Sequence, residues 1–191
     1  MKKTILTLSL LLLLIPQAQA CVGKVLTIGV KASSDRQLLA EMLSSIIMER
    51  TGTTVQIRLF KTDLELHEAI KSKQVDLSIE NTITALKELH HAPETDLNKA
   101  LEVVRTAYEK DRGLVWLKPF AFLNGSGQTP SYTATVVRED IFTNFPALPR
   151  VIAKLGAAVT DEAYMRLVRS VEAGEQPKKV AKEFLKSKKL I

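Results

Sequence analysis

From residue 24 to residue 89, strand-like and helix-like hydrophobic patterns alternate along the sequence. Short apolar runs occur at 24–30, 55–59 and 75–79, and each is followed by a stretch whose apolar residues recur every three or four positions. Strands separated by helices in this way pair in parallel, because the helix provides the crossover connection. The pattern therefore predicts the α/β class, with a single doubly wound, mostly parallel sheet flanked by helices.

Residues at the ends of the expected elements agree with this order. A serine or aspartate at 33–35 can cap the first helix, and Gly52 can end it. Thr62 and Glu65 have the spacing of a capping box at the start of the second helix. The same patterns predict further elements, in chain order a helix at 96–112, strands at 114–117 and 133–137, and helices at about 147–155, 160–173 and 176–187.

The first twenty residues have the three-part layout of a secretory signal peptide. Lys2 and Lys3 are followed by an apolar stretch from Ile5 to Ile15, and then by a small-x-small motif at 18–20. That apolar stretch is too short for a membrane-spanning helix, which needs roughly 20 residues. We therefore expect residues 1–20 to be a signal peptide and residues 21–191 to form one exported domain in the periplasm or cell envelope.

The single cysteine of the chain, Cys21, directly follows the expected cleavage point. Lipoprotein processing requires a cysteine at this place, so we expect Cys21 to be lipidated and to provide the chain's contact with the membrane. The Ala18–Ala20 motif also suits an ordinary signal peptidase, which would release the domain into the periplasm. With one cysteine, no intrachain disulfide can form.

The remaining composition gives little support for nucleic-acid binding or catalysis. The formal net charge is +6, or a mild +4 without the two lysines of residues 1–20. Acidic and basic residues are interspersed, unlike the basic face of a nucleic-acid-binding domain, except in the last helix, where lysines accumulate. His90 and His91 are adjacent and cannot share a face, and His67 lies among acidic residues in a pattern typical of a surface. We expect no catalytic residue, no metal site and no cofactor.

Several segments, in the correct order, resemble one known family. The sequences at 24–31, 69–77, 113–119 and 133–138 are similar to OpuAC-like substrate-binding proteins of quaternary-amine ABC importers, which bind glycine betaine, choline or carnitine. The resemblance implies a non-catalytic role in solute transport, with an ABC permease as partner. It also implies the fold of one lobe of a type II periplasmic binding protein.

The resemblance also shows what the chain lacks. Family members have two lobes that close around the ligand. Here a bridge at 124–132 stands where the second lobe would be inserted, so we expect residues 21–191 to form a single-lobe domain. An alternative is a protein-interaction or self-associating module without a small-molecule ligand, in which a homo-oligomer could rebuild a two-sided cleft.

The resemblance places ligand-binding turns at the ends of two strands, where open α/β sheets bind ligands. The candidate ligand-binding residues are Ser33, Ser34, Glu80, Asn81 and Thr82, with Phe120 and Phe122 near the missing cleft. Asn81 stands where the family has an aromatic residue, so the cage that holds a quaternary ammonium is incomplete. We therefore expect weak or altered capture of quaternary amines, or capture of another small polar solute. Helix capping is the alternative role of the serines and of residues 80–82.

Overall fold

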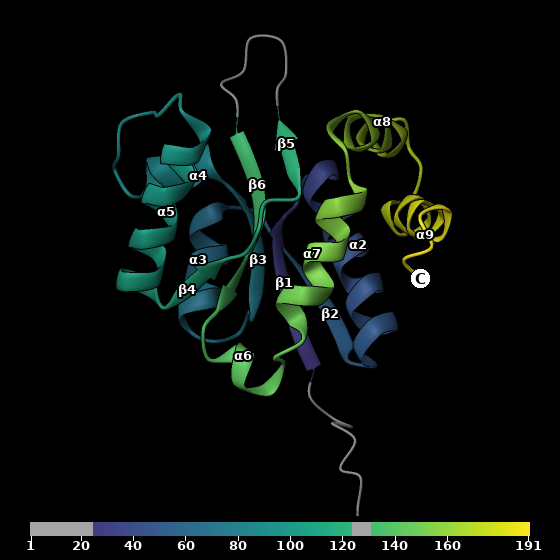
Figure 1. Ribbon diagram of the computed structural model, residues 1–191, viewed down its shortest axis with the longest axis horizontal. Helices are drawn as coiled ribbons and strands as arrows, with labels where there is room; N and C mark the ends of the chain where they lie inside the picture. Colours follow the sequence, from purple (N-terminus) through teal and green to yellow (C-terminus); the bar gives the residue numbers. More distant parts are fainter. Residues whose placement is uncertain (1–24, 124–130) are drawn as a thin grey trace, which may run out of the picture.

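The computed structural model describes residues 25–123 and 131–191, which form one six-stranded sheet with helices on both faces (Figure 1). The strand order is β2-β1-β3-β6-β4, and β5 also pairs with β6. The strands are β1 (Val25–Lys31), β2 (Thr54–Phe60), β3 (Leu77–Asn81), β4 (Leu114–Trp116), β5 (Ala121–Leu123) and β6 (Ser131–Arg138).

The strands of this sheet point the same way, with the exception of β6. Strand β1 pairs in parallel with β2 and β3, with Ile28 opposite Ile57 and Leu77. Strand β6 runs antiparallel to β3, β4 and β5. The predicted α/β class and mostly parallel sheet are confirmed, and the mixed character comes from this one reversed strand.

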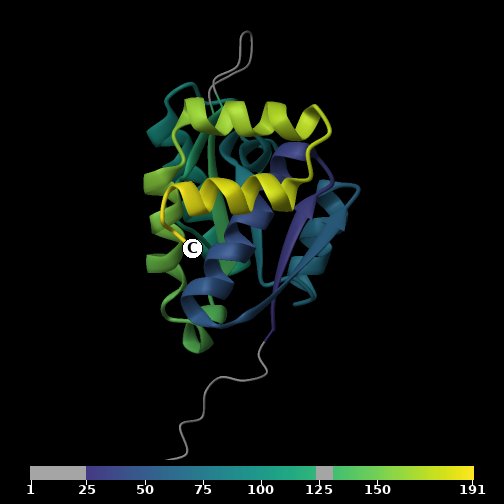
Figure 2. The same cartoon turned by 90° about the vertical axis from the view of Figure 1, so that its right-hand side faces the viewer.

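Four helices form an apolar layer on one face of the sheet. They are α2 (Ser34–Thr51), α7 (Leu148–Ala158), α8 (Asp161–Glu172) and α9 (Pro177–Ser187), with the short α6 (Ile141–Asn144) beside them. Helix α2 is covered on most sides, because α8 and α9 pack outside it (Figure 2). Its buried positions therefore include neighbours such as Leu38, Leu39 and Ala40, all with no exposed surface.

Three helices cover the other face: α3 (Asp63–Lys71), α4 (Thr82–Glu88) and α5 (Leu97–Arg112). Helix α3 lies very close to β1 at Gly29. A Cβ atom on Gly29 would lie 2.6 Å from Leu66 Cδ1 and 2.8 Å from Val75 Cγ1. Any larger residue at this position would push α3 away from the sheet.

The expected signals at the helix ends are largely confirmed. Thr62 and Glu65 form the predicted capping box at the start of α3. Gly52 ends α2 in the left-handed conformation, with φ of 68°. Ser33 is the N-cap residue of α2, but its side chain makes no capping hydrogen bond. The sequence patterns did not predict β5 or α6, which have three and four residues.

Residues 1–20, Cys21 and most of the bridge at 124–132 lie outside the described residues. The signal peptide and the lipidation of Cys21 therefore stay predictions. In the part of the chain that the structure describes, no helix has both the length and the apolar character to cross a membrane.

Candidate functional site

A pocket of about 250 Å³ opens at the carboxyl ends of β1 and β3. These strands are neighbours, and the helices that follow them, α2 and α4, go to opposite faces of the sheet. A crevice forms wherever the chain departs in opposite directions like this, and open α/β sheets bind ligands there. The pocket is lined by Lys31, Ser33, Asp35, Arg36, Asp63, Leu66, His67, Ile79, Glu80, Asn81 and Thr84.

Three of the predicted ligand-binding residues, Ser33, Glu80 and Asn81, meet in the wall of this pocket. Asn81 also caps α4, because its Oδ1 accepts a hydrogen bond from the Thr84 amide at 2.8 Å. Ser34, the first residue of α2, does not line the pocket. The turn after β3 thus has the capping role that we considered as an alternative, in addition to its place at the pocket.

The other predicted residues lie elsewhere. The Thr82 hydroxyl is buried and lies 3.2 Å from Ser131 Oγ, so it joins α4 to β6. Phe120 is 3% exposed and belongs to the apolar core beside α7. The backbone of Phe122 lies in β5, opposite Tyr132 of β6. Among the residues that line the pocket, none is a phenylalanine, tyrosine or tryptophan.

The charged groups at the pocket rim are paired with one another. Lys31 Nζ lies 2.9 Å from Asp63 Oδ2, and Arg36 Nε lies 3.5 Å from Asp35 Oδ2. The Arg36 guanidinium also donates to the Ile79 carbonyl at the end of β3, at 3.1 Å. The rim therefore offers both charges and hydrogen-bonding groups, without an excess of either sign.

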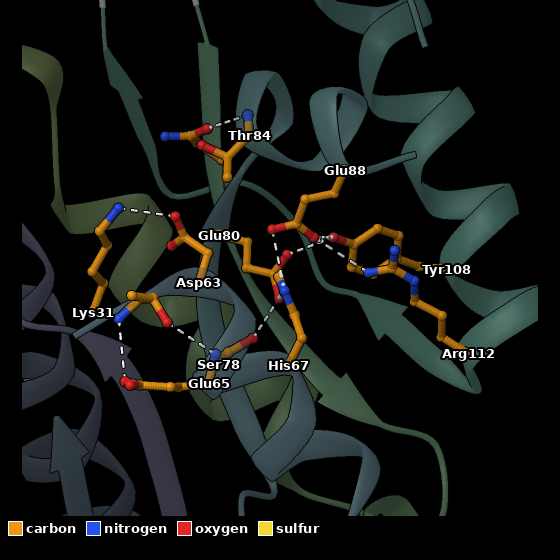
Figure 3. Close-up of polar contacts among 12 residues, drawn as sticks. Lys31, Asp63, Glu65, His67, Ser78, Glu80, Thr84, Glu88, Tyr108 and Arg112 are labelled. Carbon is orange, nitrogen blue, oxygen red and sulfur yellow. Dashed lines mark hydrogen bonds and ion pairs between the residues drawn. The ribbon is translucent and has the colours of Figure 1, made fainter. Parts of the chain in front are cut away.

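Behind the pocket lies a group of side chains that we call the ion cluster: His67, Ser78, Glu80, Glu88, Tyr108 and Arg112 (Figure 3). His67 lies between the two carboxylates, with Nε2 3.4 Å from Glu80 Oε1 and Nδ1 3.1 Å from Glu88 Oε1. Ser78 and Tyr108 each donate a hydrogen bond of 2.8 Å to Glu80. Four elements, α3, β3, α4 and α5, therefore meet through polar contacts.

The contacts in the ion cluster shift the pKa values of its members. Burial alone would lower the pKa of His67, but the hydrogen bonds and negative charges of Glu80 and Glu88 raise it to about 10. Burial alone would raise the pKa of Glu80, but His67, Tyr108 and Ser78 hold it below its usual value. Burial and the nearby carboxylates raise the pKa of Tyr108. At neutral pH His67 is therefore an imidazolium between two carboxylates.

The prediction that His67 lies on the surface was wrong. Its side chain is only 20% exposed, because the ring turns toward β3 and α4. Its position next to Leu66 and three residues before Ile70, both buried, was the signal that could have located it. The partner Glu80 lies on β3, outside this helix. The acidic residues that flank His67 in α3 suggested an exposed position and gave no indication of the contact with Glu80.

His67, Glu80 and Glu88 can each offer one ligand atom, all within 4.8 Å of one another, which is compatible with a divalent cation. In this structure, however, each ring nitrogen of His67 faces a different carboxylate. Nε2 makes a hydrogen-bond contact with Glu80, and Nδ1 makes an ion-pair contact with Glu88, which suits a protonated ring. A protonated His67 can supply positive charge between the two carboxylates.

A second, wider hollow of about 1070 Å³ lies between α3 and the ends of α4 and α5. His67 and Glu88 line this hollow, and His67 also lines the smaller pocket. The ring of His67 therefore separates the two spaces.

The fold thus presents a polar pocket at the strand ends, and the charges at the pocket rim are paired with one another. A family model described as "Substrate binding domain of ABC-type glycine betaine transport system" (OpuAC) matches residues 24–128, more than half of the chain. The chain therefore belongs to the OpuAC family of substrate-binding domains, a non-catalytic family.

Solved structures of similar fold agree with this assignment. A glycine betaine/carnitine/choline ABC transporter protein aligns with a TM-score of 0.78 and 14% identity, over 86% of this chain and 99% of the other. Apo YehZ from Escherichia coli also aligns with a TM-score of 0.78 and 14% identity, over 88% of this chain and 100% of the other. Lactococcal OpuAC in complex with glycine betaine aligns with a TM-score of 0.60 and 11% identity, over 87% of this chain and 96% of the other. No curated protein sequence matches the chain.

Proposed function

We propose that this chain is an exported solute-binding component of an ABC importer, and that it takes its solute in the pocket at the ends of β1 and β3. The observation that carries the proposal is the meeting of Ser33, Glu80 and Asn81 at the crevice of the sheet, in a chain of this family. The partners expected are a small polar solute and an ABC permease.

The pocket argues for altered selectivity within the family. A quaternary ammonium cannot donate hydrogen bonds, so a protein holds it with aromatic ring faces. The lining residues include no phenylalanine, tyrosine or tryptophan, and the acids at the rim already have cationic partners. Glycine betaine and choline should therefore bind weakly, and a solute with hydrogen-bonding groups should bind better.

The domain organisation is part of the same proposal. Residues 124–130 connect β5 to β6, at the place where the family resemblance implies that a second lobe would be inserted. We propose that residues 21–191 are a single lobe, exported by residues 1–20 and held at the envelope by a lipid on Cys21. Replacing Cys21 with alanine should move the protein from the membrane fraction to the soluble fraction and abolish labelling by radioactive palmitate.

Calorimetric titration with glycine betaine, choline, carnitine and proline tests the proposed pocket. Micromolar binding of proline with weak or no binding of the quaternary amines is the expected result. Asn81→Ala should weaken binding at least tenfold, whereas Asn98→Ala, at an exposed asparagine of α5, should not. Because Asn81 also caps α4, circular dichroism must show that the variant is folded.

Two results would overturn the proposal. Tight binding of glycine betaine would contradict the loss of selectivity for quaternary amines. The absence of heat with any solute, together with a dimeric mass in solution, would favour the alternative of a self-associating module without a small-molecule ligand.

A further inference from the structure

The two ring nitrogens of His67 are held by carboxylates from two different elements. Nε2 lies 3.4 Å from Glu80 Oε1 on β3, and Nδ1 lies 3.1 Å from Glu88 Oε1 on α4 (Figure 3). A neutral imidazole has a single N–H and would turn a lone pair toward one of these oxygens. The two ion-pair contacts therefore favour a protonated, cationic ring at this position.

The groups around the ring have balanced charges. Glu88 also contacts Arg112, at 3.4 Å, and the Arg112 guanidinium lies over the Tyr108 ring. Glu80 is 6% exposed, and its other partners, Ser78 and Tyr108, are neutral hydroxyl donors. Within residues 25–123 and 131–191, His67 is the one cation in ion-pair contact with Glu80. Without His67, a buried carboxylate would lack a counter-ion.

The position of this cation lies at the proposed solute pocket. His67 and Glu80 both line the small pocket at the ends of β1 and β3, and His67 and Glu88 both line the wider hollow. Removing the imidazole would thus leave both carboxylates without the cation between them, with Glu80 in the wall of the small pocket and Glu88 in the wall of the wider hollow. The space left by the ring has the charge and location of a binding site for an organic cation.

We propose that His67 is the specificity-determining residue of the pocket: its side chain occupies a cation site formed by Glu80 and Glu88, and so excludes solutes with a net positive charge, such as choline. This inference rests on the proposed function, because it takes the small pocket as the solute site. The chain carries a latent organic-cation site, filled by one of its own side chains. Solutes that bind beside His67 are therefore neutral or anionic.

Chemical rescue tests this inference. His67→Ala, in the full exported chain purified from cells, removes the ring and keeps both carboxylates. In buffer with EDTA at about pH 5.5, where free imidazole is mostly protonated, imidazolium should bind this variant at least tenfold more tightly than it binds the unmodified protein. The binding should raise the thermal midpoint of the variant. Choline should show the same gain.

Two controls separate charge from volume. Pyrazole is a ring of the same size that stays neutral at this pH, so it should not rescue His67→Ala. The double variant His67→Ala/Glu80→Gln should also lose the response to imidazolium. His91→Ala, at an exposed loop histidine, should behave like the unmodified protein. If His67→Ala does not fold, His67→Gln provides a second variant, and it should gain choline binding without imidazolium rescue.

Three results would overturn the inference. Equal rescue by pyrazole and imidazolium would show that the ring fills volume rather than a cation site. A variant with no gain for choline would show that the site does not control solute selectivity. Stabilisation of the unmodified protein by Zn²⁺, lost in His67→Ala, would make the three side chains a metal site. These three results come from experiments with the variants or with Zn²⁺. A failure of the proposed function would be seen in a different experiment, the titration of the unmodified protein with solutes.

Discussion

The two faces of the sheet are built differently. The face under α2, α7, α8 and α9 is an apolar layer in which packing supplies the contacts. The face under α3, α4 and α5 has a smaller apolar core that surrounds the ion cluster. The comparison indicates that the first face stabilises the domain, whereas the second combines stability with a polar site next to the pocket.

The helix starts differ in the same way. Helices α3, α4 and α5 each begin with a residue whose side chain accepts a capping hydrogen bond: Thr62, Asn81 and Asp96. On the apolar face, α8 also has such a cap, in Thr160, whereas α2, α7 and α9 begin without one. The elements that position the ion cluster are thus held at their ends by local polar bonds, whereas α2 is held by burial along its length.

The largest effect is expected from a cavity on the apolar face. Leu39→Ala removes a fully buried side chain of α2 and should lower the free energy of unfolding by about 3 kcal/mol. The change should be the same at pH 6 and pH 9, because the atoms removed are apolar and take part in no ion pair. Urea unfolding measures it, and a loss below about 1 kcal/mol would contradict the view that packing dominates this face.

The next effect should come from Glu80 on the polar face. Glu80→Gln keeps the shape of the side chain but removes the negative charge that pairs with His67, so unfolding free energy should fall by about 2 kcal/mol. NMR titration should also show a lower pKa for His67 in the variant. Glu65→Gln, at an exposed position of α3, is the matched control and should change the His67 pKa little.

The polar face should also make stability depend on pH. The pKa of His67 is raised from 6.5 to about 10, so its stabilising contribution is complete below about pH 6.5 and is lost as pH rises toward 10. After allowing for solvent screening, the loss should be on the order of 2 kcal/mol. Urea unfolding of the protein and of His67→Gln should be measured at several pH values. The free energy of unfolding should fall more steeply with rising pH for the unmodified protein than for the variant. Parallel curves would mean that His67 is not charged in the fold.

The smallest effect should distinguish the two kinds of helix start. Thr62→Ala removes both the accepted bond and the geometry of the capping box on α3, and should destabilise the protein by about 1 kcal/mol. Ser33→Ala should change stability by less than about 0.5 kcal/mol, because the Ser33 side chain makes no capping bond. Thermal unfolding measures both variants. Equal losses of stability in Thr62→Ala and Ser33→Ala would contradict this difference between the two helix starts.

Local sequence signals determined much of the fold. The period of the apolar residues located β1, β2 and β3 and the long helices, since burial on one face requires that spacing whatever the partner is. Capping signals located the start of α3 and the end of α2, because they act over three or four residues. The turns after β1 and β3 located Ser33, Glu80 and Asn81 at the pocket.

The tertiary structure alone decided the direction of β6 and the contacts of His67. An apolar strand has the same pattern in either direction, and β6 is reversed through its pairing with β3. His67 meets Glu80 across a separation of 13 residues and Glu88 through α4, so its neighbours in sequence could indicate its burial but not its charge. Periodicity shows which residues face inward, but the charge of a buried group depends on which distant side chains the fold brings to it.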